Sequence, residues 1–461
     1  MSLPSKPLLK HPSGMQLALA SALLSLSASS YAIDFGPDGM FSLTGFAKME
    51  VAMKANKCDK CALLPGEPKD RIWADELVNG KEYKTMGETT VMFQPWFGAK
   101  YNLGNGFTAT GLLSQRWRGS SSNLPNALTA IDLDLEYNYS KTWNQQTVYE
   151  KNVAISHEDY GRVAYGSMTA RGWAVADYPY GTNIGLANEW GGSGAGYGML
   201  GNAIRVTTRP LDVMNGDLVL EATIDQGNTG FTKNKPLLIE LYAQYHQGAL
   251  VVDAVYQNAK NGKPLAWGHA PFSGLTDSAA DDSLLTSGAE QSMAMAVARY
   301  QLTSQIELSG GVRANRWSGM RAIQLSTGAQ GLWNNMFNVA WDTNVGGVAN
   351  PGYAASSVDL SAGARYRTGP WTASVGLIYL GTASTSNPTE RGQSNDATAA
   401  TVGLNYDYGQ GIQFYGFAGM SHFGRIGLSP MSMPGNNAFW GVDSRVTQDG
   451  NWFGAGVVYT F

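Results

Sequence analysis

The sequence has little charge and lacks long apolar runs. Only 15% of its 461 residues are Asp, Glu, Lys or Arg, whereas soluble domains average about 25%. Mean hydropathy is −0.20, and beyond the N-terminus no apolar run reaches the roughly 18 residues of a membrane-spanning helix. Membrane-spanning helices are therefore excluded. Glycine is abundant at 56 residues and aromatic residues make up 11%, a combination that favours a β-rich protein.

Cysteine is almost missing, and residue patterns for catalysis are missing too. The two cysteines, Cys58 and Cys61, form a CxxC motif in "NKCDKCALL". Haem attachment needs a histidine directly after such a motif, and zinc needs a second pair of ligands; the sequence supplies neither. In an oxidising envelope we expect a small disulfide between them. The histidines show no ligand or triad spacing, so we predict no enzyme, no metal and no cofactor.

The N-terminus has the pattern of a secretory signal peptide. Lys6 and Lys10 precede the apolar stretch "MQLALASALLSLSA", and "SSYA" follows, ending at Ala32. This stretch is too short for a membrane anchor, so a cleaved signal is favoured. We expect residues 1–32 to be removed and residues 33–461 to form one domain. Without Lys6 and Lys10, 30 basic residues face 36 acidic ones, and this mild acidity predicts no nucleic-acid partner.

Apolar and polar residues alternate along most of the mature chain. In "FSLTGFAKMEVAMK", from Phe41, apolar side chains share one face of a strand and charged side chains the other. "LIELYAQYH" and "SVDLSAGARYR" repeat this pattern. A strand with this pattern lies between two different surroundings, one apolar and one polar. Short turns alternate with long polar loops, and seven turns with eight loops predict sixteen strands, an even number that allows the first and last strands to pair.

These strands fit a membrane barrel better than a soluble sandwich or a solenoid. A sandwich carries many charges outside its compact cores, whereas the polar faces here carry few, and no short fixed-period repeat exists. In a barrel the apolar face meets lipid, the polar face meets a water-filled lumen, and closure pairs the backbone amides. We predict an all-β, antiparallel, transmembrane β-barrel. Aromatic residues near strand ends suit interfacial girdles: Trp96, Trp317, Trp371, Tyr379, Tyr406 and Trp452.

Two segments bear on the closure of the barrel. "GNWFGAGVVYTF", residues 450–461, alternates up to Phe461, with Phe453 on the lipid face and Gly454 on the lumen face. We expect it to be the closing strand, because an open sheet edge is not tolerated in hydrocarbon. Residues 130–139 also have a strand pattern, but counting them would make the total odd. We place them inside the second long loop; an eighteen-strand barrel would need another partner for them.

The sequence resembles the general, trimeric porins of Gram-negative bacteria, of the betaproteobacterial type. The resemblance covers essentially the whole mature chain and rests on the order of five segments: "GMFSLTGFAKME", "FGAKYNLGNGFTATGLL", "VAISHEDYGRVAYGS", "NAIRVTTRP" and "GAGVVYTF". It implies a sixteen-stranded outer-membrane barrel, a homotrimer, a third loop folded into the lumen, and a final Phe461 that the outer-membrane assembly machinery recognises. Outer-membrane lipids and lipopolysaccharide are further implied partners.

The resemblance assigns the constriction loop to about residues 169–201, and a solvated surface loop is the alternative. We expect its acidic and aromatic residues at the constriction: Asp177, Glu189, Tyr178, Tyr180 and Trp190. By strand parity, eight basic residues face the lumen and form a candidate basic wall: Lys48, Lys100, Arg116, Arg118, Arg205, Arg313, Arg365 and Arg367. Arg205 is favoured because it lies just after the loop. The family's usual Gly-Arg-Gln before the loop is Gly166-Ser167-Met168 here, which leaves ion selectivity open.

We predict a channel for passive diffusion of small hydrophilic solutes and ions. The loop aromatics leave open a substrate-specific porin for an aromatic or anionic solute. The CxxC motif leaves open a barrel sheath around a redox partner, as in an outer-membrane electron conduit.

Overall fold

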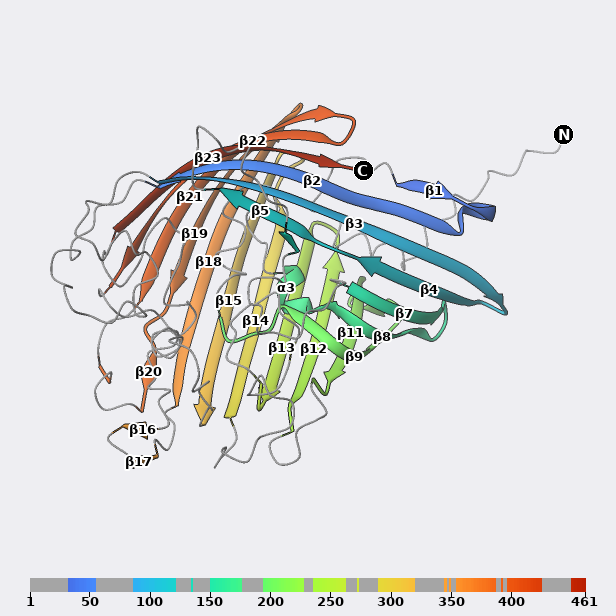
Figure 1. The fold of residues 1–461 in the computed structure, drawn as a ribbon, viewed down its shortest axis with the longest axis horizontal. Coiled ribbons are helices and arrows are strands. Elements are labelled where there is room, and N and C mark those ends of the chain that lie inside the picture. Colours follow the sequence, from blue (N-terminus) through green and yellow to red (C-terminus); the bar gives the residue numbers. More distant parts are fainter. Residues whose placement is uncertain are drawn as a thin grey trace.

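In a computed structural model, the chain forms one closed ring of antiparallel strands (Figure 1). The structure describes residues 32–54, 86–121, 134–135, 150–175, 194–227, 235–262, 272, 289–319, 344–345, 348–349, 354–386, 391–392, 396–424 and 449–461. The predicted signal peptide and the CxxC pair lie outside these ranges. None of the helices in the described ranges has the length and apolar character needed to span a bilayer.

Sixteen strands make up the ring, and each pairs with the next along the chain. They are β2 (Phe41–Lys54), β3 (Met86–Gly104), β4 (Phe107–Ser114), β7 (Glu150–His157), β8 (Gly161–Thr169), β9 (Met199–Thr207), β11 (Gly216–Asp225), β12 (Leu237–Gln247), β13 (Leu250–Lys260), β14 (Ala289–Gln301), β15 (Ile306–Gly319), β18 (Ala355–Thr368), β19 (Trp371–Leu380), β21 (Ala397–Gly409), β22 (Ile412–Phe423) and β23 (Asp449–Thr460). The prediction of a sixteen-stranded antiparallel barrel is confirmed.

The first and last ring strands close the barrel. β23 pairs with β2 from Phe46 opposite Thr460 to Lys54 opposite Trp452, and Figure 1 shows the two strands side by side. Phe461 extends the seam, because its backbone N–H donates to the carbonyl of Gly45 (3.0 Å) and its carbonyl accepts from the Gly45 N–H (2.8 Å). Closure satisfies the backbone groups that lipid cannot.

Short elements decorate the ring. β5 (Trp117–Ser121) continues β4 along β3, and β6 (Asp134–Leu135) pairs with β5. The described part of residues 130–139 is thus a two-residue addition inside a loop and not a ring strand. The remaining short elements are β1 (Ile33–Phe35), η1 (Pro37–Gly39), α3 (Arg171–Val175), β10 (Leu211–Val213), β16 (Asn344–Val345), β17 (Val348–Ala349) and β20 (Ser384–Thr385).

The two faces of the wall differ as the sequence alternation predicts. Along β18, Val358 and Leu360 are 53% and 49% exposed on the outer face, whereas Asp359 and Arg365, on the inner face, are 0% and 7% exposed. On the outer face near the short turns, Tyr300, Tyr366, Trp371 and Tyr459 are also exposed. Aromatic side chains at this level form the periplasmic girdle of an outer-membrane barrel.

Two of the six aromatic residues predicted for the interfacial girdles face the lumen instead of the lipid. Trp371 and Tyr379 point outward, and the Tyr406 ring lies 4.7 Å from that of Trp371. Trp452, by contrast, is 3% exposed, and the Trp96 indole donates to the buried Glu150 carboxylate (3.0 Å). Both tryptophans occupy inward positions, because the face alternates with every residue of a strand. The Trp317 side chain lies outside the described residues.

Aromatic rings lie over glycines on the inner face next to the seam. The cross-strand pairs are Tyr415 with Gly456, Phe417 with Gly454, and Trp452 with Gly419. A Cβ on Gly454 would lie 2.4 Å from the Phe417 ring and 2.5 Å from the backbone oxygen of Val51 across the seam. Because Gly454 has no side chain, β22 and β2 can lie this close to β23.

We predict that Gly454→Ala weakens the seam, because the new methyl group meets backbone that cannot move away without breaking strand pairing. Overpacking of this kind costs about 1–3 kcal/mol. Gly416→Ala is the matched control, since its nearest atom is 3.7 Å away. Heat-modifiable migration on SDS gels measures the folded fraction. Equal unfolding temperatures for the two variants would contradict the tight packing at Gly454.

Candidate constriction site

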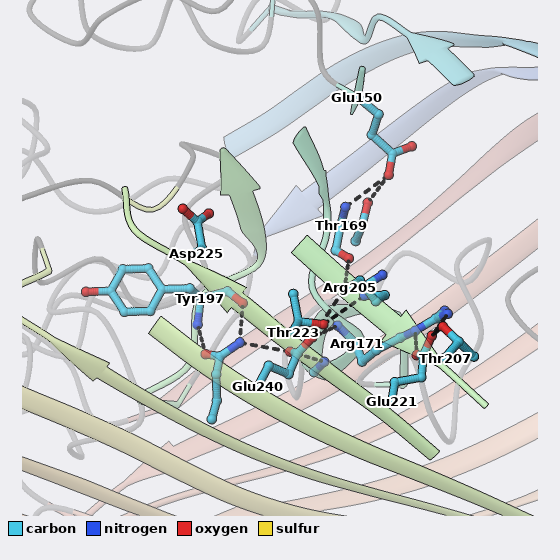
Figure 2. Close-up of polar contacts among 12 residues, drawn as sticks. Glu150, Thr169, Arg171, Tyr197, Arg205, Thr207, Glu221, Thr223, Asp225 and Glu240 are labelled. Atoms are coloured by element: carbon cyan, nitrogen blue, oxygen red, sulfur yellow. Dashed lines mark hydrogen bonds and ion pairs between the residues drawn. The ribbon is translucent and has the colours of Figure 1, made fainter. Parts of the chain in front are cut away.

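The loop between β8 and β9 begins against the inner wall of the barrel. α3 follows β8 directly, and the backbone N–H groups of Arg171 and Gly172 donate to the Glu240 carboxylate of β12 (2.9 and 3.2 Å). Amide groups at a helix start have no partner within the helix. Glu240 supplies those partners and thereby fixes the start of the loop to the wall (Figure 2).

Glu240 is the centre of a larger polar network. Besides the two α3 amides, its carboxylate accepts from Nη2 of Arg205 (3.3 Å) and from Nε2 of Gln257 (2.9 Å). Glu240 and Arg205 are both buried. A buried carboxylate without compensating donors is strongly unfavourable, so these contacts on β9, β12, β13 and α3 depend on one another.

Arg171 makes the second ion pair of the network. Its guanidinium binds both carboxylate oxygens of Glu221 on β11, with Nη2 2.9 Å from Oε2, and lies over the Tyr242 ring at 5.4 Å. Burial alone would lower the pKa of Arg171, but the Glu221 carboxylate outweighs burial and the net shift is upward. The ion pair with Glu221 therefore favours the charged form of Arg171, and bidentate geometry fixes its orientation.

The loop returns along a different part of the wall. The Tyr197 N–H donates to Oε1 of Gln257 (2.6 Å), and Nε2 of Gln257 donates back to the Tyr197 carbonyl (3.2 Å). Ala195 is held by Asn315 of β15 (2.9 Å) and Gln291 of β14 (2.5 Å). The described ends of the loop thus run across inward-facing side chains of β12, β13, β14 and β15. This arrangement places the two described ends of the third loop against the inner wall of the barrel.

Apolar contacts support the return of the loop. Tyr197 is 3% exposed and meets Phe272 edge to face, with ring centroids 5.0 Å apart. Ring pairs of this geometry add about 0.5–1.5 kcal/mol beyond burial. Met199 and Leu200 are fully buried beside them. The lumen therefore contains a small hydrophobic core, which holds the loop together with the polar network.

A third group of contacts extends the network from β9 to the strands that precede it in the ring. Arg205 donates from Nε to the Thr223 hydroxyl (2.9 Å) and from Nη2 to the Thr169 carbonyl (3.0 Å). The Thr169 hydroxyl donates to Glu150 (2.7 Å), which also accepts from the Trp96 indole. One chain of hydrogen bonds thus links β3 to β13 around the inner wall.

The predicted basic residues are spread around the ring, and four of the eight are paired with acids, among them Arg205 with Glu240. Lys48 lies 2.9 Å from Glu50, and Arg365 lies 3.6 Å from Glu307. The remaining described residues are placed as follows: Arg313 is fully buried 2.9 Å from Asp359, Arg116 donates to Gln94, Lys100 is exposed near the end of β3, and Arg367 is half-buried near the end of β18. The Arg118 side chain lies outside the described residues. Their role in selectivity stays a prediction.

The predicted residues of the loop's middle lie outside the described residues. These are Asp177, Tyr178, Tyr180, Glu189 and Trp190, and the same holds for Cys58 and Cys61.

Sequence reasoning missed the acidic and amide partners of the network. Glu221, Glu240 and Asp359 lie on inward strand positions, as do Gln257 and Asn315. The alternation that placed the arginines in the lumen places these residues there too. Loop contacts between residues far apart in sequence, such as Tyr197 with Gln257, have no signal in a single sequence.

We predict that Glu240→Ala loosens the third loop without unfolding the barrel. The variant removes the acceptor of two α3 amides and leaves Arg205 partly unpaired, a loss of about 3–5 kcal/mol for a broken buried pair. In planar bilayers, open-channel current noise should rise and mean conductance should change. Glu307→Ala is the control, because it removes an inward carboxylate that pairs with Arg365 rather than with the loop. Equal noise in both variants would contradict the anchoring role of Glu240.

Comparisons with known proteins match the chain to a family model and to several solved structures. A family model described as Gram-negative porin matches residues 18–425. Among solved structures, the anion-selective porin from Comamonas acidovorans is 12% identical, with a TM-score of 0.52 over 91% of this chain and 99% of that one. OmpF of Salmonella typhi, in complex with daunomycin, is 13% identical, with a TM-score of 0.50 over 93% and 100%. OmpT of Vibrio cholerae is 11% identical, with a TM-score of 0.50 over the same shares. A search of curated proteins finds no match. At these identities the structural likeness shows the fold alone.

Proposed function

The chain belongs to the Gram-negative porins, and from this premise we propose how its lumen selects solutes. It is an outer-membrane channel built on a sixteen-stranded barrel. Small hydrophilic solutes diffuse through it passively, past a constriction formed by the third loop, and no reaction is catalysed. Selection is by size and hydration more than by charge, so uncharged polar solutes and ions of both signs pass.

Pairing of the inward charges supports this proposal most strongly. Five inward basic side chains each face a carboxylate across 3.6 Å or less: Lys48, Arg171, Arg205, Arg313 and Arg365. A pair of opposite charges has a field that falls off faster with distance than the field of one charge. A permeating ion therefore experiences less attraction or repulsion than an unpaired row of arginines would produce.

Arg162 is the exception near the constriction. It lies on β8, half-buried, close enough to be repelled by Arg171 and Arg205 and attracted by Glu221. Among the residues that the structure describes, no carboxylate lies within ion-pair distance of Arg162. We assign to it a weak preference for anions at this level of the lumen.

No observation favours an enzyme. Within the described ranges, no three His, Cys, Asp or Glu side chains gather as metal ligands would. The barrel fold and family indicate a channel.

We further propose a homotrimer, as in the trimeric porins that the sequence resembles. Mass measurement of the detergent-solubilised protein tests it directly. A particle of three chains is the expected result, and a single-chain particle would contradict it.

We predict opposite shifts in selectivity for two charge-removing variants. Glu221→Gln frees Arg171 and should favour anions, whereas Arg162→Gln removes the unpaired charge and should favour cations. One charge at roughly 8 Å in water is worth about 0.5 kcal/mol, a factor of about two in local ion concentration. Reversal potentials in a potassium chloride gradient measure both shifts.

Two outcomes would contradict the proposal. Shifts of the same sign would mean that the Arg171 cluster does not face the ion path. Conductance that saturates with one solute and is blocked by it would identify a substrate-specific porin in place of a general one.

A further inference from the structure

Three polar side chains of the barrel wall are buried without a hydrogen-bond partner. They are Ser374 on β19 and Thr401 and Asn405 on β21, and 8%, 2% and 8% of their surfaces are exposed. Among the residues that the structure describes, nothing bonds to the Ser374 Oγ, Thr401 Oγ1 or Asn405 Oδ1 atom. A buried polar group without a partner is strongly unfavourable and rare. Three of them on neighbouring strands therefore indicate that a molecule outside the chain supplies their partners.

Strand register places these side chains in one line on the inner face. Ser374 pairs with Arg365 of β18 on one side and with Gly403 of β21 on the other, so it faces the lumen as Arg365 does. Thr401 and Asn405 are the inward residues on either side of Gly403, because the face alternates along a strand. From Thr401 to Asn405 is four residues, or about 14 Å of strand. The unpartnered atoms thus follow β21 over this length, with Ser374 opposite its middle.

Glycines surround the line on the same face. Gly376 pairs with Thr401, and Gly403 pairs with Ser374, so neither position carries a side chain. A glycine inside a strand weakens the strand and often marks a place where a ligand comes close to the backbone. Two of them beside unpartnered hydroxyls indicate the same close approach.

The larger side chains on both flanks have partners away from the line. On β18, Arg365 lies 3.6 Å from Glu307 of β15. On β22, the Tyr415 and Phe417 rings lie over two glycines of β23. Ser374 and its two neighbours on β21 are thus left to a partner from outside the chain.

The line is reached from the side of the short turns. Thr372 on β19 and Asp407 on β21 are the next inward residues in that direction, and both are partly exposed. The short turns face the periplasm in an outer-membrane barrel. A solute therefore reaches the line from the periplasmic end of the lumen.

We propose that the line of Ser374, Thr401 and Asn405 binds an uncharged, polyhydroxylated solute of about disaccharide length. Each hydroxyl of the line can donate and accept a hydrogen bond, and the Asn405 oxygen accepts one. A disaccharide carries hydroxyls along its whole length and so matches groups that are spread along a strand. The inference rests on the proposed channel function, because the solute enters through the lumen.

The chemistry of the line favours a neutral solute over an anion. None of the three side chains is charged, and the Asn405 carbonyl oxygen repels a carboxylate or a phosphate. Arg365, the cation next to Ser374, is paired with Glu307. Separate water molecules would satisfy the same atoms, and the absence of sugar binding would identify them.

A solute on this line leaves the constriction to ions. The described contacts of the third loop are with β11 to β15, whereas the line follows β21 on another part of the wall (Figure 1). The site thus favours polyhydroxylated solutes among those that pass.

The test uses the full-length barrel, refolded in detergent, with lactose as the probe and saturation-transfer NMR to measure its dissociation constant. A double variant, Ser374→Ala with Thr401→Val, removes two hydroxyls of the line. Thr110→Val, on the inner face of β4, is the matched control. Removal of an unpartnered hydroxyl relieves an unfavourable burial, so the double variant should unfold at the same temperature as the unaltered barrel or at a higher one. This readout separates loss of binding from loss of folding.

We expect lactose to bind the double variant about tenfold more weakly, since each lost hydrogen bond weakens binding severalfold. Thr110→Val should bind lactose as the unaltered barrel does. Lactobionate, which adds a carboxylate, should bind no better than lactose, and a polyethylene glycol of equal size should bind at least about tenfold more weakly, because it lacks the row of hydroxyls.

Three results would overturn the inference: no lactose binding by the unaltered barrel, equal lactose affinity in the double variant and the control, or tighter binding of lactobionate than of lactose. Potassium chloride conductance should be equal in all three proteins. Its absence from the unaltered barrel would count against the proposed channel function, whereas normal conductance without lactose binding would overturn this inference alone.

Discussion

Backbone hydrogen bonding in hydrocarbon is the constraint on which this structure depends. A strand in lipid must pair on both edges, since water is not there to replace a missing partner. The seam between β2 and β23 completes this pairing, and Phe461 extends it by two further hydrogen bonds to Gly45. Once the ring is closed, alternate side chains must face lipid or lumen. The two faces of every strand follow from that closure.

The lumen is organised by the need to pair buried charges. Glu240 is bonded to two backbone amides, an arginine and a glutamine, and Arg171 is bonded to Glu221. Because the partners come from α3, β9, β11 and β13, the network both fixes the start of the third loop and cancels much of the charge beside it. We propose that the same set of contacts shapes the pore and weakens its ion selectivity.

Alternation made most of the wall predictable from the sequence, and it was more reliable than residue type. Parity puts Phe453 outward and Gly454 inward, which already places Trp452 in the lumen, whereas the preference of tryptophan for interfaces placed it wrongly in a girdle. Strand count followed from turn spacing, because short and long connections alternate around a barrel. The resemblance to porins supplied the prediction that the third loop folds into the lumen.

The contacts of that loop were not predictable in the same way. Tyr197 meets Gln257 and Ala195 meets Asn315 across long sequence separations, and no local periodicity records such pairs. The sequence did place Glu240 and Arg205 on polar faces, yet their proximity depends on the register of three neighbouring strands.

Hydrogen–deuterium exchange of the protein in lipid tests the central claim, that both ends of the third loop are fixed to the lumen wall, most directly. The amides of Arg171, Gly172, Ala195 and Tyr197 donate to side chains of the wall. Peptides covering residues 170–175 and 194–200 should therefore exchange as slowly as the ring strand β13. Exchange at the rate of an unprotected chain in these peptides would contradict the account.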